Sequence, residues 1–398
     1  MKKRPLEGVK ILDLSQVLSA PFCGMILADL GAQVIKVERP GGGDISRAYG
    51  PYINDISLYF CQYNRGKRGL AVDMRTEAGK RVIMDLVAQV DVVMENFKYG
   101  TLEKLGIGYD EMLKVNPELI YGSISGFGTH GPLSHLPCMD IIAAARSGLV
   151  SQSGIDVPIK PGFSLCDTWA GLHLLRGLSM ALLHKQRTNR GVRVDIAMLD
   201  CAFYMCEAPV LEHSLTGKFA DRTGNHDPLF APCGEFAARD GNVVIAVTKE
   251  EEWLALCKAL ELCSLAEDTR FCSNELRLNN RDLLITELEG ATSFMGRYEI
   301  EKKLCEVGVP AAAVQTVAEF INNPQTQELE VISKINQPGV GDYTAVNTPI
   351  RFSKTPVDPN AEAPSFPGAH SREILTNLGY SQEKIEELIN SGAIYQSA

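Results

Sequence analysis

One carboxylate in the sequence stands in surroundings that could make it reactive. Asp167 lies in the segment PGFSLCDTWAGLHLLRGLSMALL, before a long apolar stretch that predicts a helix over residues 167–185, buried on most sides. An aspartate there most often caps the helix, which stabilises it by about 1 kcal/mol. A second role is open, because the helix dipole favours an ionised carboxylate while partial burial removes its water. Such a carboxylate can attack an activated acyl group, and the residues alone do not separate the two roles.

Two groups of cations are candidates for binding phosphate. Arg39 directly follows an expected strand at 33–38, on the edge where open α/β sheets bind ligands. Residues 64–68, NRGKR, place three cations in five positions, a pattern that suits phosphate contacts. For the second group, an ordinary solvated loop is the favoured explanation.

Several other motifs resemble known binding or catalytic sites but lack a feature that those sites need. Gly126–Gly131 has the spacing G-x-G-x-x-G, but Pro132 and Pro137 follow it where a dinucleotide site needs a helix, so a glycine turn is favoured. The segment GSISG lacks the central serine of a hydrolase elbow. The 11 cysteines form no C-x-x-C, and the seven histidines show no ligand spacing, so we expect reduced thiols and no metal.

The elements that must position these residues alternate between strand and helix. Strands are expected at 9–14, 33–38, 71–73, 91–95, 119–124 and 192–197, with helices between them, the first following a candidate N-cap at Ser19. This order predicts an α/β fold with a Rossmann-like parallel sheet. From about residue 223, two short strands and three helices predict a smaller α+β domain. The expected division is 1–222 for the large domain, 223–330 for the small domain, and 331–398 for a linker that returns to the first.

Composition narrows the class of protein. The chain of 398 residues carries a net charge of −10, which argues against a nucleic-acid surface. No apolar run is long enough to span a bilayer, and the N-terminus has no secretory pattern, so we expect a cytoplasmic protein without membrane contact.

Taken in order, long stretches of the chain resemble the class III CoA-transferases, the family of formyl-CoA transferase and of carnitine and bile-acid CoA-transferases. The resemblance covers nearly the full length. It is carried by PLEGVKILDLSQVLSAPFCGMILADLGAQVIKVERP, LYFCQYNRGKRGLAVDMRTEAGK, DVVMENFKYGTLEKLGIGYD, NPELIYGSISGFGTHGP, KPGFSLCDTWAGLH, GVRVDIAMLD and VGVPAAAVQTVAEFINNPQ.

The resemblance implies roles for individual positions. The nucleophilic aspartate falls on Asp167, with Asp140 as a weaker candidate for positioning carboxyl groups. It also implies an interlocked homodimer and CoA as substrate, with no permanently bound cofactor. The implied CoA contacts are Gln16, Ser19, Arg39, Val72, Asp73, Met74, Arg75, Asn96, Phe97, Lys98 and Lys104.

Some departures bear on the substrate. Leu18 stands where formyl-CoA transferase has Gln, Pro137 stands where it has Lys, and its glycine-rich loop has no counterpart between residues 231 and 249. Formate and oxalate are therefore disfavoured, and a short acyl-CoA such as succinyl-CoA is the expected donor. Two alternatives remain. An α-methylacyl-CoA racemase is disfavoured because Met139 stands where a proton-transferring His is needed. A non-catalytic CoA-binding protein would use Asp167 only as a cap.

Overall fold

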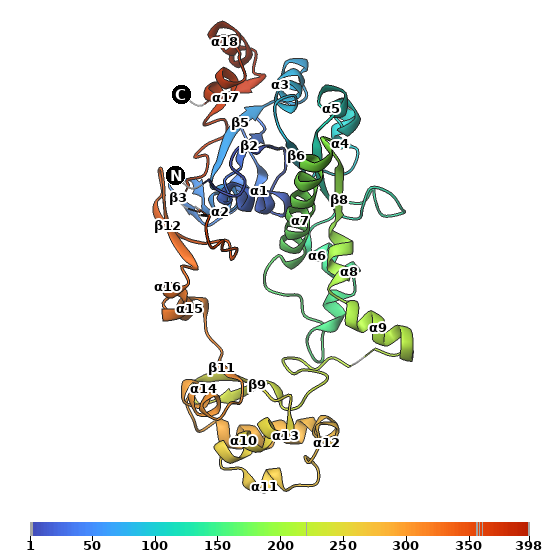
Figure 1. Cartoon of the computed structure of the whole chain (residues 1–398), viewed down its shortest axis with the longest axis vertical. Coiled ribbons are helices and arrows are strands. Elements are labelled where there is room, and N and C mark those ends of the chain that lie inside the picture. Colours follow the sequence, from blue (N-terminus) through green and yellow to red (C-terminus); the bar gives the residue numbers. More distant parts are fainter. Residues whose placement is uncertain (1–2, 220, 356, 358, 360, 397–398) are drawn as a thin grey trace. The chain divides into compact units, whose positions relative to one another are not determined.

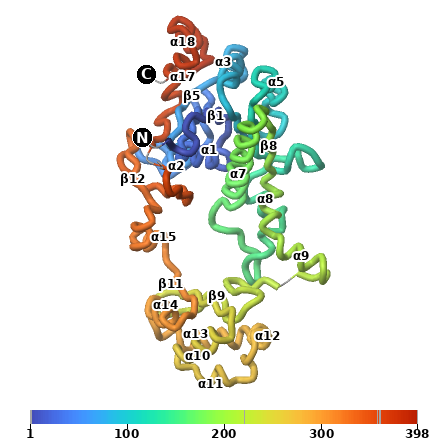
Figure 2. The backbone as a smooth tube through the Cα atoms, viewed as in Figure 1, coloured from blue at the N-terminus to red at the C-terminus, as the bar shows by residue number. Residues whose placement is uncertain are grey.

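The computed structural model describes residues 3–219, 221–355, 357, 359 and 361–396. Its contacts divide the chain into two compact units. The first unit comprises Met1–Leu149, Pro161–Cys206 and Gln325–Ala398, and the second comprises Val150–Lys160 and Glu207–Pro324. Figure 2 lets the reader follow the chain from one unit to the other and back. The division at residues 222 and 330 stays a prediction.

A seven-stranded sheet forms the centre of the first unit, in the order β14-β5-β2-β1-β6-β7-β8. All neighbours are parallel except β14, which runs antiparallel to β5. This confirms an α/β fold with a mainly parallel sheet. The strands are β1 (Lys10–Asp13), β2 (Gln33–Glu38), β5 (Lys67–Val72), β6 (Val92–Glu95), β7 (Ile120–Ser125), β8 (Arg193–Ala197) and β14 (Ile394–Tyr395).

The order of the strands defines where a ligand is expected. From β1 the chain builds β2 and β5 on one side, and then crosses to build β6, β7 and β8 on the other. The switch of direction therefore lies between β1 and β6. In open α/β sheets, ligands bind at the carboxyl ends of the strands at such a point.

Helices cover both faces of this sheet (Figure 1). Side chains alternate along β1 and β6, so Leu12 and Val93 point to one face while Asp13 and Met94 point to the other. The first face is covered by α3 (Glu77–Val87), α4 (Thr101–Leu105), α5 (Tyr109–Val115), α17 (Ser371–Asn377) and α18 (Gln382–Asn390). The second is covered by α1 (Ser19–Asp29) and α7 (Leu165–Thr188), which pack together, with α2 (Leu58–Asn64) against α1 and α8 (Met198–Tyr204) against α7.

Local sequence explains these helices. In α3, the Thr76 hydroxyl accepts the Gly79 N–H at 3.0 Å as an N-cap, and Val82, Ile83 and Leu86 form a buried stripe at helical spacing. Helix α7 packs closely on β7 because residue 122 of that strand is glycine. A Cβ at Gly122 would lie 2.9 Å from a methyl group of Leu174 on α7. Small residues therefore set how closely helix and sheet approach.

The remaining elements form the second unit and complete the first. The second unit has a three-stranded antiparallel sheet packed on helices around Trp253 and Phe236. It contains α9 (Glu207–Thr216), β9 (Cys233–Ala238), β10 (Gly241–Ala246), α10 (Glu250–Ala259), α11 (Cys263–Ala266), α12 (Asn274–Asn279), α13 (Arg281–Thr292), α14 (Arg297–Glu306), β11 (Ala311–Ala313) and α15 (Val317–Ile321). The first also holds β3 (Tyr52–Ile53), β4 (Ile56–Ser57), α6 (Asp140–Arg146), α16 (Pro324–Glu328) and the hairpin of β12 (Ile332–Gln337) with β13 (Gly341–Val346).

Two details expected of the helices are wrong. Ser19 is the first residue of α1 rather than its N-cap, which is Leu18, and no side chain caps this helix. Helix α7 is not buried on most sides. Leu172, Met180 and Leu183 lie on its outer face and are 39%, 60% and 47% exposed, because no other part of the described chain covers them.

Among the described residues, no helix is long and apolar enough to cross a membrane. The cytoplasmic location stays a prediction.

Candidate active site

Three residues expected to contact CoA meet at the switch point between β1 and β6. The side chain of Asn96, which follows β6, accepts the Gln16 N–H through Oδ1 at 2.7 Å. Its Nδ2 donates to the Gln16 carbonyl at 2.7 Å and to Ser19 Oγ at 3.1 Å. The structure therefore brings Gln16, Ser19 and Asn96 together, and it uses the Asn96 amide to hold the loop after β1.

A buried ion pair holds the same loop from the other side. Lys36 Nζ lies 2.8 Å from the Asp44 carboxylate, and it also donates to the Ser15 carbonyl. Asp44 accepts the Val17 N–H at 3.1 Å. Val17 has φ +65°, a strained conformation for a β-branched residue. The backbone around Gln16 is thus fixed by Lys36, Asp44 and Asn96 at the start of α1.

This arrangement predicts that an Asn96→Ala variant loses about 10- to 100-fold in kcat/KM for acyl-CoA, because the loop at Gln16 relaxes. We expect it to lose about 1–2 kcal/mol of stability as well. Asn116→Ala is the matched control, since the Asn116 amide donates to the carbonyls of Val87 and Val90 at the opposite edge of the sheet. Steady-state kinetics and thermal unfolding check both variants. An equal loss of kcat/KM in the two variants would contradict a specific role for Asn96.

Asp167 is the third residue of α7, and it does not cap that helix. The N-cap is Ser164, whose side chain makes no capping bond. The cap comes from Asp140 at the start of α6, which accepts the Cys166 N–H at 2.8 Å and the Asp167 N–H at 3.3 Å. Within the described residues, no group donates a hydrogen bond to the Asp167 carboxylate. The capping role proposed for Asp167 is therefore wrong.

The surroundings of Asp167 favour its neutral form. Burial first, and then the negative charge of Asp140, raise the pKa of Asp167 to about 7. The helix dipole alone predicts an ionised carboxylate at this position. Loss of water and the charge of a second carboxylate outweigh the dipole. Asp167 is thus divided between its charged and neutral forms near pH 7.

Asp167 lies close to the switch point. One helical turn after it, a Cβ added to Gly171 would lie 2.4 Å from the Ser19 carbonyl oxygen, so α7 touches the first turn of α1. The charge of Asp167 also helps to raise the pKa of Tyr59 and Tyr63 on α2, after burial, which is the larger cause. The nucleophile candidate and the Gln16–Ser19 loop therefore share one end of the sheet.

The other expected CoA contacts lie after neighbouring strands at this edge. Arg39 follows β2 and is exposed. Val72 is buried as the last residue of β5, so it could offer only its backbone. The Arg75 guanidinium is paired with Asp73 at 2.9 Å. Of the rest, Met74 and Phe97 are partly buried against the core, while Lys98 and Lys104 are exposed.

The cluster at residues 64–68 is neither a phosphate site nor a solvated loop. Arg65 is fully buried and pairs with Asp29 at 2.8 Å, and Lys67 is buried and pairs with Asp13 at 2.8 Å. Arg68 is exposed and pairs with Glu373. The charges of Arg65 and Lys67 are therefore neutralised inside the protein.

Sequence reasoning missed Asp44, Lys36 and Glu95, all buried at the carboxyl ends of β2 and β6 or just after them. Lys36 alternates with buried apolar residues in QVIKVE, and a charged residue within such a strand was the available signal. Asp44 carried no signal, because its partners come from distant segments.

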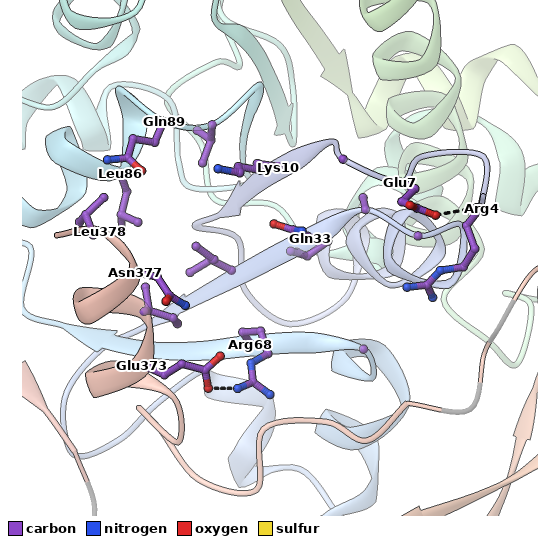
Figure 3. A pocket seen from close by; sticks show the side chains of 18 residues that line it. Arg4, Glu7, Lys10, Gln33, Arg68, Leu86, Gln89, Glu373, Asn377 and Leu378 are labelled. Carbon is purple, nitrogen blue, oxygen red and sulfur yellow. Dashed lines mark hydrogen bonds and ion pairs between the residues drawn. The ribbon is translucent and has the colours of Figure 1, made fainter. Parts of the chain in front are cut away.

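A cavity of about 520 Å³ lies at the opposite edge of the sheet (Figure 3). Its lining includes Lys10, Gln33 and Arg68, at or near the amino ends of β1, β2 and β5. Figure 3 shows Arg68 turned to Glu373 and Glu7 turned to Arg4. This cavity is separated from Asp167 by the length of the strands and is not the candidate site.

The described residues contain no group of three or more His, Cys, Asp or Glu side chains that could hold a metal ion. The expected glycine turn after β7 is confirmed, since no helix begins between Gly126 and Met139.

Comparisons with known proteins identify the family of the chain. The family model described as CoA-transferase family III matches residues 6–371. Succinyl-CoA:glutarate CoA-transferase of Mus musculus is 36% identical over 99% of this chain and 91% of its own length. Succinyl-CoA:mesaconate CoA-transferase of Haloarcula marismortui is 37% identical over 94% of this chain and 96% of its own.

Solved structures show the same fold. A CAIB/BAIF family protein from Brucella suis superposes with a TM-score of 0.86 and 34% identity, over 95% of this chain and 100% of that one. Rv3272 from Mycobacterium tuberculosis superposes with a TM-score of 0.83 and 30% identity, over 94% and 99%. On the family match and on this full-length similarity, the chain belongs to CoA-transferase family III and is a CoA-transferase.

Proposed function

We propose that this enzyme transfers CoA between short carboxylic acids and that Asp167 is its nucleophile. The observation that supports the proposal is that Asp140 and Asp167 have different roles at the start of α7. Asp140 accepts the N–H groups at the start of α7, and the Asp167 carboxylate receives no donor among the described residues. A partly buried carboxylate that receives no hydrogen bond gains most when it forms a neutral ester-like bond.

In the proposed reaction Asp167 attacks the acyl carbonyl of the donor thioester. The C–S bond breaks, CoA leaves as a thiolate, and a mixed anhydride forms. The thiolate then attacks the Asp167 carbonyl of the anhydride, the C–O bond breaks, and the donor acid leaves as a carboxylate. An aspartyl-CoA thioester remains, and the acceptor carboxylate runs the same two steps in reverse. One thioester replaces another of similar energy, and no net proton is consumed.

Backbone groups near Asp167 support this chemistry. The N–H groups of Ser19 and Ala20 begin α1 without a capping side chain and have no acceptor among the described residues. Preorganised N–H groups at such a position stabilise developing oxyanions. CoA would lie along the carboxyl edge of the sheet, on the loops after β1, β2, β5 and β6 that hold the expected contacts, with Asp140 positioning the start of α7.

The proposed donor is a short acyl-CoA such as succinyl-CoA. Relatives at 36% and 37% identity are named for succinyl-CoA with glutarate or mesaconate, and one of Acetobacter aceti at 38% identity, over 83% of this chain, is named acetyl-CoA:oxalate CoA-transferase. Racemisation gains no support, because Met139, 67% exposed, offers no group for proton transfer.

We also propose that the enzyme works as an interlocked homodimer. The exposed apolar side chains on the outer face of α7, and Phe203 and Tyr204 on the adjacent α8, are candidates for contact with a second copy. No cofactor is needed beyond CoA, which is a substrate.

The proposal is tested by trapping the intermediate. Incubation of the full chain with succinyl-CoA and no acceptor should leave CoA covalently bound, and borohydride or hydroxylamine should then mark one peptide at Asp167. Mass spectrometry of that peptide checks the site, and a panel of acyl-CoA donors with short acids identifies the pair. If transfer proceeds while no adduct forms on Asp167, the proposed mechanism is wrong.

A further inference from the structure

Glu95 is a buried carboxylate at the end of β6, directly before Asn96. Its Oε2 accepts the N–H of Phe97 at 2.7 Å, and its Oε1 accepts the hydroxyl of Ser123, which stands opposite it in the parallel pair of β6 and β7. The side chain is therefore fixed at both oxygens. It turns the chain from the strand into the loop at residues 96–98.

That loop connects Glu95 to the candidate active site. Asn96 holds the backbone of Gln16 and the hydroxyl of Ser19, as described above. Side chains alternate at the end of a strand, so Glu95 lies on the face covered by α4 and α5 while Asn96 turns to the face of α1. Asn96 therefore links the position of Glu95 to the loop after β1.

The electrostatic surroundings of Glu95 contain no cation paired with it among the described residues. The net effect raises the pKa of Glu95 to about 7. Burial raises this pKa most, the hydrogen bonds from Ser123, Phe97 and Tyr121 lower it, and the charge of Glu103 on α4 raises it further. The other titratable neighbour is Tyr121 on β7, whose pKa is raised by burial and then by Glu95. The guanidinium of Arg193 lies over the Tyr121 ring, 5.5 Å from its centroid.

We propose that Glu95 is a positioning residue for the CoA-binding loop at 96–98, and that CoA binds more tightly when Glu95 is protonated. The proposal rests on the proposed function, since it needs CoA at this loop. Bound CoA brings phosphate charges to the carboxyl edge of the sheet, where an ionised Glu95 repels them. Glu95 therefore takes up a proton when CoA binds, and the affinity for CoA falls as pH rises through neutrality.

The test compares wild type with Glu95→Gln. The Gln carbonyl can still accept the Phe97 N–H, and its amide can donate to Ser123, so the loop keeps its anchor without the charge. Free CoA is titrated calorimetrically into the full chain between pH 6 and 8.5. The wild-type Kd should rise about 3- to 10-fold more than that of the variant over this range. CoA's own phosphates titrate in both proteins, so the comparison cancels their effect.

Two further variants separate positioning from charge. Glu95→Ala lacks the anchor and should raise KM for acyl-CoA at every pH by about 10-fold, more than it lowers kcat. Glu118→Gln removes an exposed carboxylate elsewhere in the same unit and should keep the wild-type pH profile. An equal pH slope in Glu95→Gln and wild type, or a wild-type KM in Glu95→Ala, overturns the inference. Trapping of CoA on Asp167 is measured in the same variants. If CoA is trapped on Asp167 although the Glu95 variants behave as wild type, the inference on Glu95 is wrong and the proposed function stands.

Discussion

An Asp167→Asn variant is expected to lose at least about 10³-fold in CoA transfer. The amide has the shape of the carboxylate but cannot form the anhydride, so neither the anhydride nor the aspartyl-CoA thioester can accumulate. Initial rates of thioester exchange at saturating acyl-CoA measure the loss. Binding of free CoA, measured separately, should change little, because the reacting oxygen makes no hydrogen bond that holds the site together.

The same variant should be more stable than wild type above neutral pH. The folded protein holds the pKa of Asp167 at about 7, above its ordinary value of 3.8. Between these values the folded chain binds more protons than the unfolded chain, so wild-type stability falls as pH rises through this window. Asparagine avoids that loss. Since Asp167 is only partly buried, we expect a gain of about 1–3 kcal/mol at pH 8, and almost none at pH 4, by denaturant unfolding.

The matched control is Asp110→Asn, which changes an exposed aspartate in the first turn of α5. It should alter neither the rate of transfer nor the pH dependence of stability. Substantial activity in Asp167→Asn would remove Asp167 as the nucleophile. A variant that is inactive and also less stable at pH 8 would contradict the raised pKa.

Much of this site was predictable because it depends on the order of strands and helices. Alternation of short apolar strands with helices places residues after β1, β2 and β6 at one edge of a parallel sheet, and Arg39, Gln16 and Asn96 stand at those positions. Asp167 was found because a lone carboxylate before an apolar helix is conspicuous at the level of sequence.

The rest depends on contacts between distant segments, which a single sequence does not encode locally. Arg65 and Lys67 read as solvated cations until Asp29 and Asp13, 36 and 54 positions earlier, are seen to neutralise them. The outer face of α7 reads as core because its composition is apolar, yet the single chain does not cover it. The cap of α7 comes from Asp140, 26 positions before Cys166. The sequence alone therefore could not show that Asp167 does not cap this helix.

Two substitutions at Asp140 should distinguish the effect of its hydrogen bonds to the start of α7 from the effect of its negative charge. Asp140→Ala removes the acceptor for the Cys166 and Asp167 N–H groups, which leaves the start of α7 without its partner. We expect a loss of about 1–2 kcal/mol in stability and about 10- to 100-fold in kcat, because Asp167 stands in the turn that is released. Chemical denaturation and single-turnover rates measure the two effects.

Asp140→Asn keeps an oxygen for those N–H groups and removes only the negative charge. Since the charge of Asp140 is the second cause of the raised pKa of Asp167, after burial, that pKa should fall in the variant. Protonated Asp167 cannot attack, so kcat/KM of wild type should decline as pH falls below about 7. In Asp140→Asn the decline should begin at a lower pH, by about one unit, while stability stays near that of wild type. If the decline keeps its position in Asp140→Asn, the two carboxylates are not coupled. If Asp140→Ala is as stable and active as wild type, Asp140 does not hold the helix that presents the nucleophile.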